Sequence, residues 1–153
     1  MDTEPATFSS RVDYMGLIHR YLAPTTRAYA IYITHVHMVT ALARNMAQAS
    51  GLSASSLQFI EEAAMLHDIG IVRTHAPGIG CYGMAPYIAH VEEGRKMLEA
   101  EGLPQHARVA ATHIGLGGLT REDIQRQQLP LPERDFSCVT DEERIISLAD
   151  LFF

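Results

Sequence analysis

Two adjacent residues near the middle of the chain, His67 and Asp68, have side chains that could bind a metal ion. An imidazole nitrogen beside a carboxylate oxygen forms a mixed pair of donors that suits divalent cations. The pair follows an apolar helical pattern that ends at Gly70, so we expect both side chains to be buried. A buried carboxylate without a partner is costly, and a metal ion can offset that cost. On these residues alone, a capped helix end with a hydrogen-bonded histidine is the alternative.

A second histidine, His35, is in line with the apolar stripe of a helix that we expect to begin after Thr34 and end by Gly51. A lone histidine in such a stripe is more commonly a hydrogen-bonded core residue than a ligand. His37 lies about 200° around the same helix and is the lesser candidate.

Three further polar residues are directed inward by helical periodicity. His90 and His113 each share a helix face with apolar residues, and the helix of His113 is expected to begin at Pro104. Asp150 lies on the last helix, which is expected to begin with a capping box at Thr140. Buried without partners, each would cost on the order of a few kcal/mol, whereas a shared metal centre satisfies them together. The candidate metal ligands are His35, His67, Asp68, His90, His113 and Asp150.

The fold predicted from the sequence is all-α. Nearly every long segment has helical rather than alternating periodicity, and no internal repeat is visible. A chain of 153 residues is long enough for one domain, so we expect a single-domain helical bundle over residues 1–153. Its core begins at about residue 28, and residues 1–27 add an N-terminal helix that packs on it. His106 lies in the first turn of a helix and is expected to be exposed.

The composition excludes several classes of partner and location. A net charge of −6 argues against binding to a nucleic-acid polymer or to an anionic membrane surface. No segment approaches the roughly 18 apolar residues of a membrane span, and the acidic N-terminus lacks a secretory pattern. Cys81 and Cys138 are isolated and fit reduced thiols. We therefore expect a cytoplasmic protein.

A segment rich in Gly and Pro, residues 77–86, is predicted to be a loop. It contains the pattern G-x-G-x-x-G, but no strand precedes it, so we reject a dinucleotide-binding fingerprint. The hypothesis we retain is a mobile flap over the site, with Tyr82 and Tyr87 available to stack on a base or sugar. The alternative is a plain connecting loop.

The order of the candidate ligands resembles the HD-domain superfamily of metal-dependent phosphohydrolases. His67-Asp68-Ile69-Gly70 is the HDIG form of its motif, and the resemblance extends from His35 to Asp150. It implies an all-helical bundle with one metal ion on His35, His67, Asp68 and Asp150. In members with the two intermediate histidines, residues matching His90 and His113 hold a second ion, and Asp68 bridges the two. Such ions lie roughly 3.5–4 Å apart and share a water whose pKa they lower, which provides a hydroxide that attacks phosphorus.

The function implied by the resemblance is hydrolysis of a phosphate ester or anhydride, in a nucleotide or another small phosphorylated metabolite. Asp68 and Arg73 are the catalytic candidates, although Arg73 could equally be a surface arginine. The family often has lysine where this chain has Ile71, so Arg73 as its substitute is a hypothesis. Arg95 and Lys96 are expected to face solvent.

The cofactors implied are divalent metal ions, two in number, with Fe or Mn favoured and Zn, Co or Ni as alternatives. A homo-oligomer is compatible with the sequence. Two other functions stay open on the same scaffold. Some HD proteins with six such ligands are di-iron oxygenases, and a non-catalytic sensor that binds metal and nucleotide is the third hypothesis.

Overall fold

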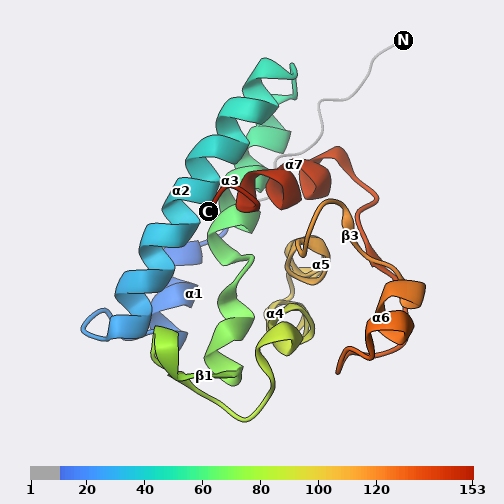
Figure 1. Cartoon of the computed structure of the whole chain (residues 1–153). Helices are drawn as coiled ribbons and strands as arrows, with labels where there is room; N and C mark the ends of the chain where they lie inside the picture. The colour runs from blue at the N-terminus through green and yellow to red at the C-terminus, as the bar shows by residue number, and fades with distance from the viewer. Residues whose placement is uncertain (1–10) are drawn as a thin grey trace.

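The computed structural model describes residues 11–153, which form a bundle of seven α-helices and confirm the all-α prediction (Figure 1). The helices are α1 (Tyr14–Tyr21), α2 (Arg27–Ala49), α3 (Ala54–Leu66), α4 (His90–Ala100), α5 (Pro104–Thr112), α6 (Arg121–Gln127) and α7 (Asp141–Asp150). Short 3₁₀ turns are η1 (Ile69–Arg73), η2 (Pro77–Ile79) and η3 (Tyr87–Ala89). Two antiparallel pairs join β1 (His75–Ala76) to β2 (Cys81–Tyr82) and β3 (Gly118–Leu119) to β4 (Phe136–Ser137).

Side-chain caps start most of the helices, and one of them corrects a prediction. Thr140 forms the predicted capping box at α7. The long helix α2, in contrast, begins eight residues before the predicted start, because Thr26 accepts the hydrogen bond from the backbone N–H of Tyr29. Thr34 lies inside the helix, and its hydroxyl donates to the carbonyl of Ala30. A threonine can bond to the preceding turn in this way, so a Thr before an apolar run does not have to be a cap.

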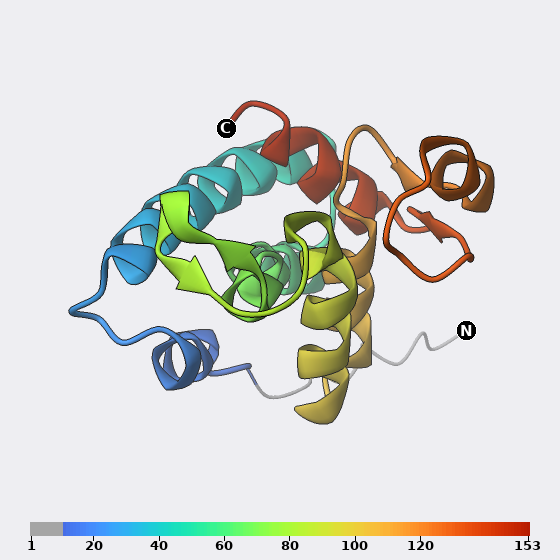
Figure 2. The same ribbon diagram turned by 60° about the horizontal axis from the view of Figure 1, so that its bottom comes forward.

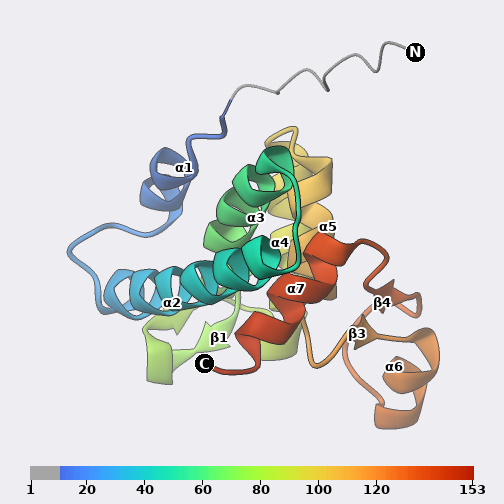
Figure 3. The same cartoon turned by 90° about the horizontal axis from the view of Figure 1, so that it is seen from above.

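The core lies between α2, α3, α5 and α7, and Figure 3 shows α7 lying against α2 and α3. Small residues such as Ala43 and Ala64 are fully buried there and let the helices approach closely. A second apolar cluster joins α1 to α2, α3 and α4 through Leu17, Ile18 and Leu22. α1 therefore packs on the bundle. The single-domain interpretation stays a prediction, and residues 1–10 lie outside the described part of the chain.

Gly70 has a different role from the one predicted. It does not close α3 as a left-handed glycine, because α3 ends at Leu66 and the chain continues into η1. A Cβ atom on Gly70 would lie 2.0 Å from the carbonyl oxygen of His90 and 2.4 Å from the backbone nitrogen of Gly94. The last residue of the HDIG motif is thus a glycine because the backbone of α4 crosses directly over it.

The segment of residues 74–86 has more structure than the predicted loop. It forms the β1–β2 hairpin with a 3₁₀ turn between the strands, and Figure 2 shows it between α2 and α4. Gly83 is required there, since a Cβ atom would lie 2.2 Å from the carbonyl carbon of Arg73. The hairpin leads into η3, and α4 begins directly after it at His90.

The prediction that His106 is exposed is wrong. Only 8% of the residue is accessible, because the first turn of α5 packs against α3. Its Nε2 atom lies 3.7 Å from Oε2 of Glu62, and its ring packs edge-on against Phe59 at a centroid distance of 4.9 Å. Burial lowers the pKa of His106 although Glu62 opposes that shift.

Among the described helices, none combines the length and the apolar character needed to cross a bilayer.

Candidate metal centre

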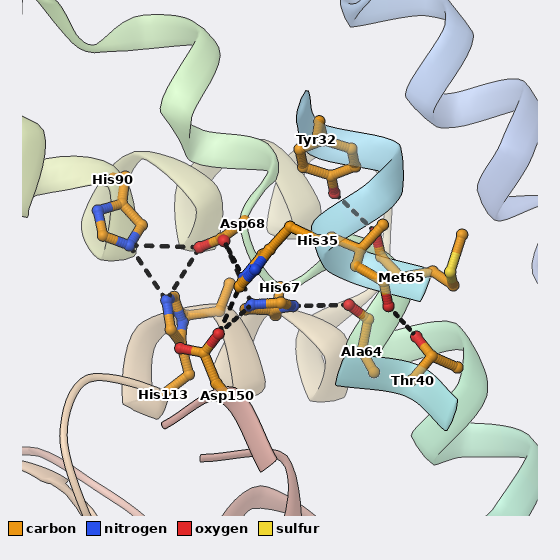
Figure 4. Close-up of polar contacts among 12 residues, drawn as sticks. Tyr32, His35, Thr40, Ala64, Met65, His67, Asp68, His90, His113 and Asp150 are labelled. Carbon is orange, nitrogen blue, oxygen red and sulfur yellow. Dashed lines mark hydrogen bonds and ion pairs between the residues drawn. The ribbon is translucent and has the colours of Figure 1, made fainter. Parts of the chain in front are cut away.

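All six predicted ligands converge in the interior (Figure 4). Five of them lie at the ends of elements, where a helix stops or starts, and His35 alone lies in the middle of a helix. They form two groups that share one residue: His35, His67, Asp68 and Asp150 in the first, and Asp68, His90 and His113 in the second. Within each group one ligand atom per residue lies within 4.8 Å of all the others, so each group could hold a metal ion.

The distances in the first group fit a common ion. Nε2 of His35 lies 3.1 Å from Oδ2 of Asp68 and 2.9 Å from Oδ1 of Asp150. Nε2 of His67 lies 3.3 Å from each of the same two oxygens. Donors bound at about 2.0–2.2 Å with octahedral to tetrahedral angles are separated by roughly 2.8–3.6 Å. All four measured separations fall in that range.

The second group uses the other oxygen of the shared carboxylate. Oδ1 of Asp68 lies 3.4 Å from Nε2 of His90 and 3.1 Å from Nε2 of His113, and the two Nε2 atoms are 3.1 Å apart. Oδ2 of Asp68 faces the first group, as described above. A carboxylate with one oxygen in each group is suited to bridge two ions.

Three of the histidines are oriented in the same way by the backbone. The Nδ1 atom of His67 donates to the carbonyl of the residue three positions earlier, at 2.6 Å, and His90 and His113 do the same at 2.6 and 2.9 Å. The carbonyl acceptors are those of Ala64, Tyr87 and Ala110. Since a carbonyl has no hydrogen to give, the proton must be on Nδ1, and the neutral ring has its lone pair on Nε2.

These lone pairs point at one another and at carboxylate oxygens, which is unfavourable unless a cation lies between them. Nε2 of His67 is buried and makes no hydrogen bond. Between His90 and His113, two Nε2 atoms face each other across 3.1 Å. A proton could relieve one such contact, but a metal ion relieves all of them in a group at once. The residues present therefore fit a pair of divalent ions.

The electrostatics of the metal-free centre lead to the same conclusion. Burial disfavours the charged form of His67, yet Asp68 and Asp150 outweigh it and raise the pKa of His67. Burial likewise opposes ionisation of Asp68, but His67, His113 and His35 hold its pKa well below the ordinary value. The centre thus keeps its carboxylates charged and attracts positive charge to the first group. In the second group burial lowers the pKa of His113, so that imidazole is neutral and ready to coordinate.

The first group lies nearer the surface than the second. The His35 side chain is 26% exposed, and the hydrogen bonds that it donates to Asp150 and Asp68 raise its pKa to about 9. The side chain of Asp150, at the end of α7, is 21% exposed. His35 and His67 lower the pKa of Asp150, although burial opposes that shift. By comparison the side chains of His90 and His113 are 3% and 2% exposed. Solvent can therefore reach the first group more readily than the second.

Other sequence candidates lie outside the two groups. His37 is exposed, as its place on the helix predicts. Arg73 is exposed at the end of η1, and no carboxylate among residues 11–153 forms an ion pair with it. Arg95 pairs with Glu92 and Glu99, and Lys96 pairs with Glu93.

Two tyrosines contribute to the centre in ways that sequence reasoning misses. Tyr32, one turn before His35, donates its hydroxyl to the carbonyl of Met65 at 2.6 Å and so ties α2 to the end of α3. Tyr87 places its ring on that of His90, with centroids 4.7 Å apart. The sequence signal that points to Tyr32 is an aromatic residue one helical turn before a candidate ligand, on the face expected to be buried. The sequence offered Tyr87 only as a residue of the flap.

Comparison with known proteins gives a family match over most of the chain. The model of the HD domain matches residues 32–152, a range that includes all six candidate ligands. An uncharacterized protein of Methanocaldococcus jannaschii, MJ0778, is 33% identical over 95 residues, which is 61% of this chain and 48% of that protein. The chain thus spans about half the length of this relative. No solved structure matches the chain.

Proposed function

The chain belongs to the HD-domain family, and from this premise we propose that it is a metal-dependent phosphohydrolase. The substrate class we propose is a phosphate ester or anhydride of a small phosphorylated metabolite, with nucleotides as the first candidates. The proposed ligands are His35, His67, Asp68 and Asp150 for one ion, and Asp68, His90 and His113 for the other. Iron or manganese suits this set of nitrogen and oxygen donors, and zinc, cobalt and nickel are alternatives.

The observation that carries the proposal is the placement of Asp68. Its two oxygens face two different sets of imidazole nitrogens, at 3.1–3.4 Å. A purely structural carboxylate in a helical core would be paired with hydrogen-bond donors on both oxygens, whereas Oδ1 of Asp68 faces the Nε2 atoms of His90 and His113, which carry lone pairs when those rings are neutral. The geometry supports a bridge between two cations better than a packing role.

The charge of the centre suits a phosphoryl group. With neutral imidazoles, Asp68 and Asp150 give the donor set a formal charge of about −2, so two divalent ions would leave an excess of about +2. That excess matches a phosphate monoester dianion. When bound, the ions would supply Lewis acidity and lower the pKa of a coordinated water, which is the chemistry that hydrolysis of a phosphate needs.

The protein's own residues would hold the reactants in place. The carbonyls of Ala64, Tyr87 and Ala110 orient three imidazoles through their Nδ1 protons, and this fixes the coordinating atoms before a substrate arrives. Arg73 has no ion-pair partner within residues 11–153 and is our candidate for neutralising a second phosphate. The dry surroundings of the second group would exclude competing water.

The test is release of inorganic phosphate from a panel of phosphorylated metabolites by protein loaded with Mn²⁺ or Fe²⁺, in the absence of oxygen. We expect turnover that chelation abolishes and that Asp68→Ala lacks. Oxygen consumption by the iron-loaded protein, without phosphate release, would contradict the proposal and favour the oxygenase. Binding of nucleotide and metal without turnover of either kind would contradict it in favour of a sensor.

A further inference from the structure

Tyr87 is not a candidate ligand, but it contacts one of them, His90, through both its main chain and its side chain. Its carbonyl accepts the 2.6 Å hydrogen bond from Nδ1 of His90, and its ring lies on the imidazole of the same residue, 4.7 Å away and tilted by 36°. The contact is made by both main chain and side chain because η3 turns directly into α4 at His90. Tyr87 therefore fixes the position of one candidate ligand.

The phenol is nevertheless accessible. Tyr87 is 50% exposed, in contrast to the nearly buried His90 beneath it. A tyrosine hydroxyl is protonated at neutral pH and can donate a hydrogen bond. No hydrogen bond from this hydroxyl to another residue of the described chain is present. A donor close to the centre, open to solvent and without a partner is available to a ligand.

The surroundings of the centre make such a donor valuable. Exposed apolar side chains follow two of the ligands in the sequence: Met38 comes three residues after His35, and Leu116 comes three residues after His113. Most of the described cations are engaged, as in the pairs of Arg95 and Arg108 with buried glutamates. Tyr87 adds a neutral hydrogen-bond donor directly beside the candidate ligand His90.

We propose that Tyr87 is a substrate-binding residue, whose hydroxyl donates a hydrogen bond to a phosphoryl oxygen while its ring covers His90. This inference rests on the proposed function, because it needs a phosphoryl group at the centre. The two parts of the side chain then have separable roles. The ring protects the second group of ligands, and the hydroxyl binds the substrate.

The variants Tyr87→Phe and Tyr87→Ala separate these roles, with Tyr82→Phe as the matched control. Tyr82 lies on strand β2 of the hairpin that precedes η3, is 73% exposed, and has no contact with a candidate ligand among those described. The probe is inorganic phosphate, titrated calorimetrically into the Mn²⁺-loaded protein, and p-nitrophenyl phosphate provides the kinetics. Metal content is measured by elemental analysis in each variant.

We expect Tyr87→Phe to keep the full metal content and to bind phosphate roughly tenfold more weakly, with a matching rise in KM, since hydrogen bonds to charged groups are among the stronger ones. Tyr87→Ala should also lose part of the second metal ion, and Tyr82→Phe should match the wild type. Equal phosphate affinity in Tyr87→Phe and wild type would overturn the inference and leave the hydrolase intact. A wild type that neither binds phosphate nor hydrolyses the ester would overturn both.

Discussion

The two halves of the candidate metal centre share Asp68 and differ in charge and in exposure. The first half has a second carboxylate, Asp150. In this half the side chains of His35 and Asp150 are 26% and 21% exposed, and those of His67 and Asp68 are less exposed. The second relies on one oxygen of Asp68 and on two imidazoles that are almost completely buried. Charge therefore favours tighter binding of a divalent ion in the first half, while burial favours slow exchange in the second.

Affinity for an ion and access to it would thus be set by different residues of the same centre. The carboxylates would attract the ions, and the backbone carbonyls that hold the imidazoles would decide where the ions can lie. Substitutions should thus affect the two halves unequally, except at the residue that they share.

Removal of the shared carboxylate should have the largest effect. Asp68→Ala is expected to lose both ions and to lower phosphate release by more than about 100-fold, since even residues outside the ligand shell are commonly worth 10–100-fold. Asp141→Ala is the control, because Asp141 is an exposed aspartate that pairs only with Arg144 at 3.1 Å. Metal content and phosphate release are measured together. Retention of both ions by Asp68→Ala would remove the proposed bridge.

Removal of one imidazole from the buried half should have a smaller and more selective effect. His113→Ala is expected to lose mainly the second ion and to lower activity by about tenfold or more. His37→Ala, which removes an exposed histidine from α2, is the matched control. Elemental analysis after dialysis distinguishes one ion per chain from two. Equal loss of both ions would mean that the halves do not bind independently.

A methyl group at Gly70 should disturb the second half of the centre by displacing the backbone of His90. In Gly70→Ala the new Cβ would meet the carbonyl of His90 at 2.0 Å, so the first turn of α4 must shift. We expect the free energy of unfolding to fall by about 1–3 kcal/mol, as for other overpacked sites, and the second ion to be weakened more than the first. Gly78→Ala is the control because a Cβ there has nothing within 4 Å. Urea unfolding measures the effect, and unchanged stability of Gly70→Ala would contradict the close approach of α4.

The pH dependence of the metal-free protein should report on the first half. Asp150 and Asp68 raise the pKa of His35 to about 9 in the folded state, from an ordinary value near 6.5. A group with a raised pKa contributes stability that is fully present below its unfolded pKa and is lost as the pH rises through the folded pKa. After allowance for solvent screening, we expect the metal-free protein to lose about 1–2 kcal/mol of stability between pH 6.5 and 9.

The variant His35→Gln should show a smaller slope, since residue 35 then has no proton to lose and only His67 keeps a raised pKa beside the same carboxylates. In the wild type the ion competes with the same proton, so the affinity for Mn²⁺ should rise over the same pH window. Thermal unfolding in chelator at several pH values measures the first effect, and calorimetric titration with Mn²⁺ measures the second. A metal-free protein that becomes more stable towards pH 9 would contradict the assigned ion pairs of His35.

Much of this centre could be predicted from the sequence because its ligands follow an ordered motif. The inward direction of His35 and Asp150 comes from helical periodicity, and the capping box at Thr140 fixes where α7 starts. The all-α fold follows from the same periodicity. These are local signals, carried by residues within one or two turns of each other.

The features that the sequence did not predict depend on contacts between distant segments. The close approach of α4 to Gly70, the burial of His106 against α3 and the packing of Tyr87 on His90 arise only after the helices have assembled. The early start of α2 was missed for a local reason, because Thr34 has the composition of a cap but bonds to the preceding turn. Helix ends and polar contacts across the core were thus harder to predict than the identities of the ligands.

The most direct test of this account is the metal stoichiometry of the freshly purified protein, before and after equilibrium dialysis against Mn²⁺. The account predicts two ions per chain at saturation, bound with two different affinities, because two groups of donors share Asp68 and differ in charge. A chain that binds no divalent ion, or binds a single ion that Asp68→Ala retains, would contradict the claim that the buried histidines and aspartates converge in order to hold two cations.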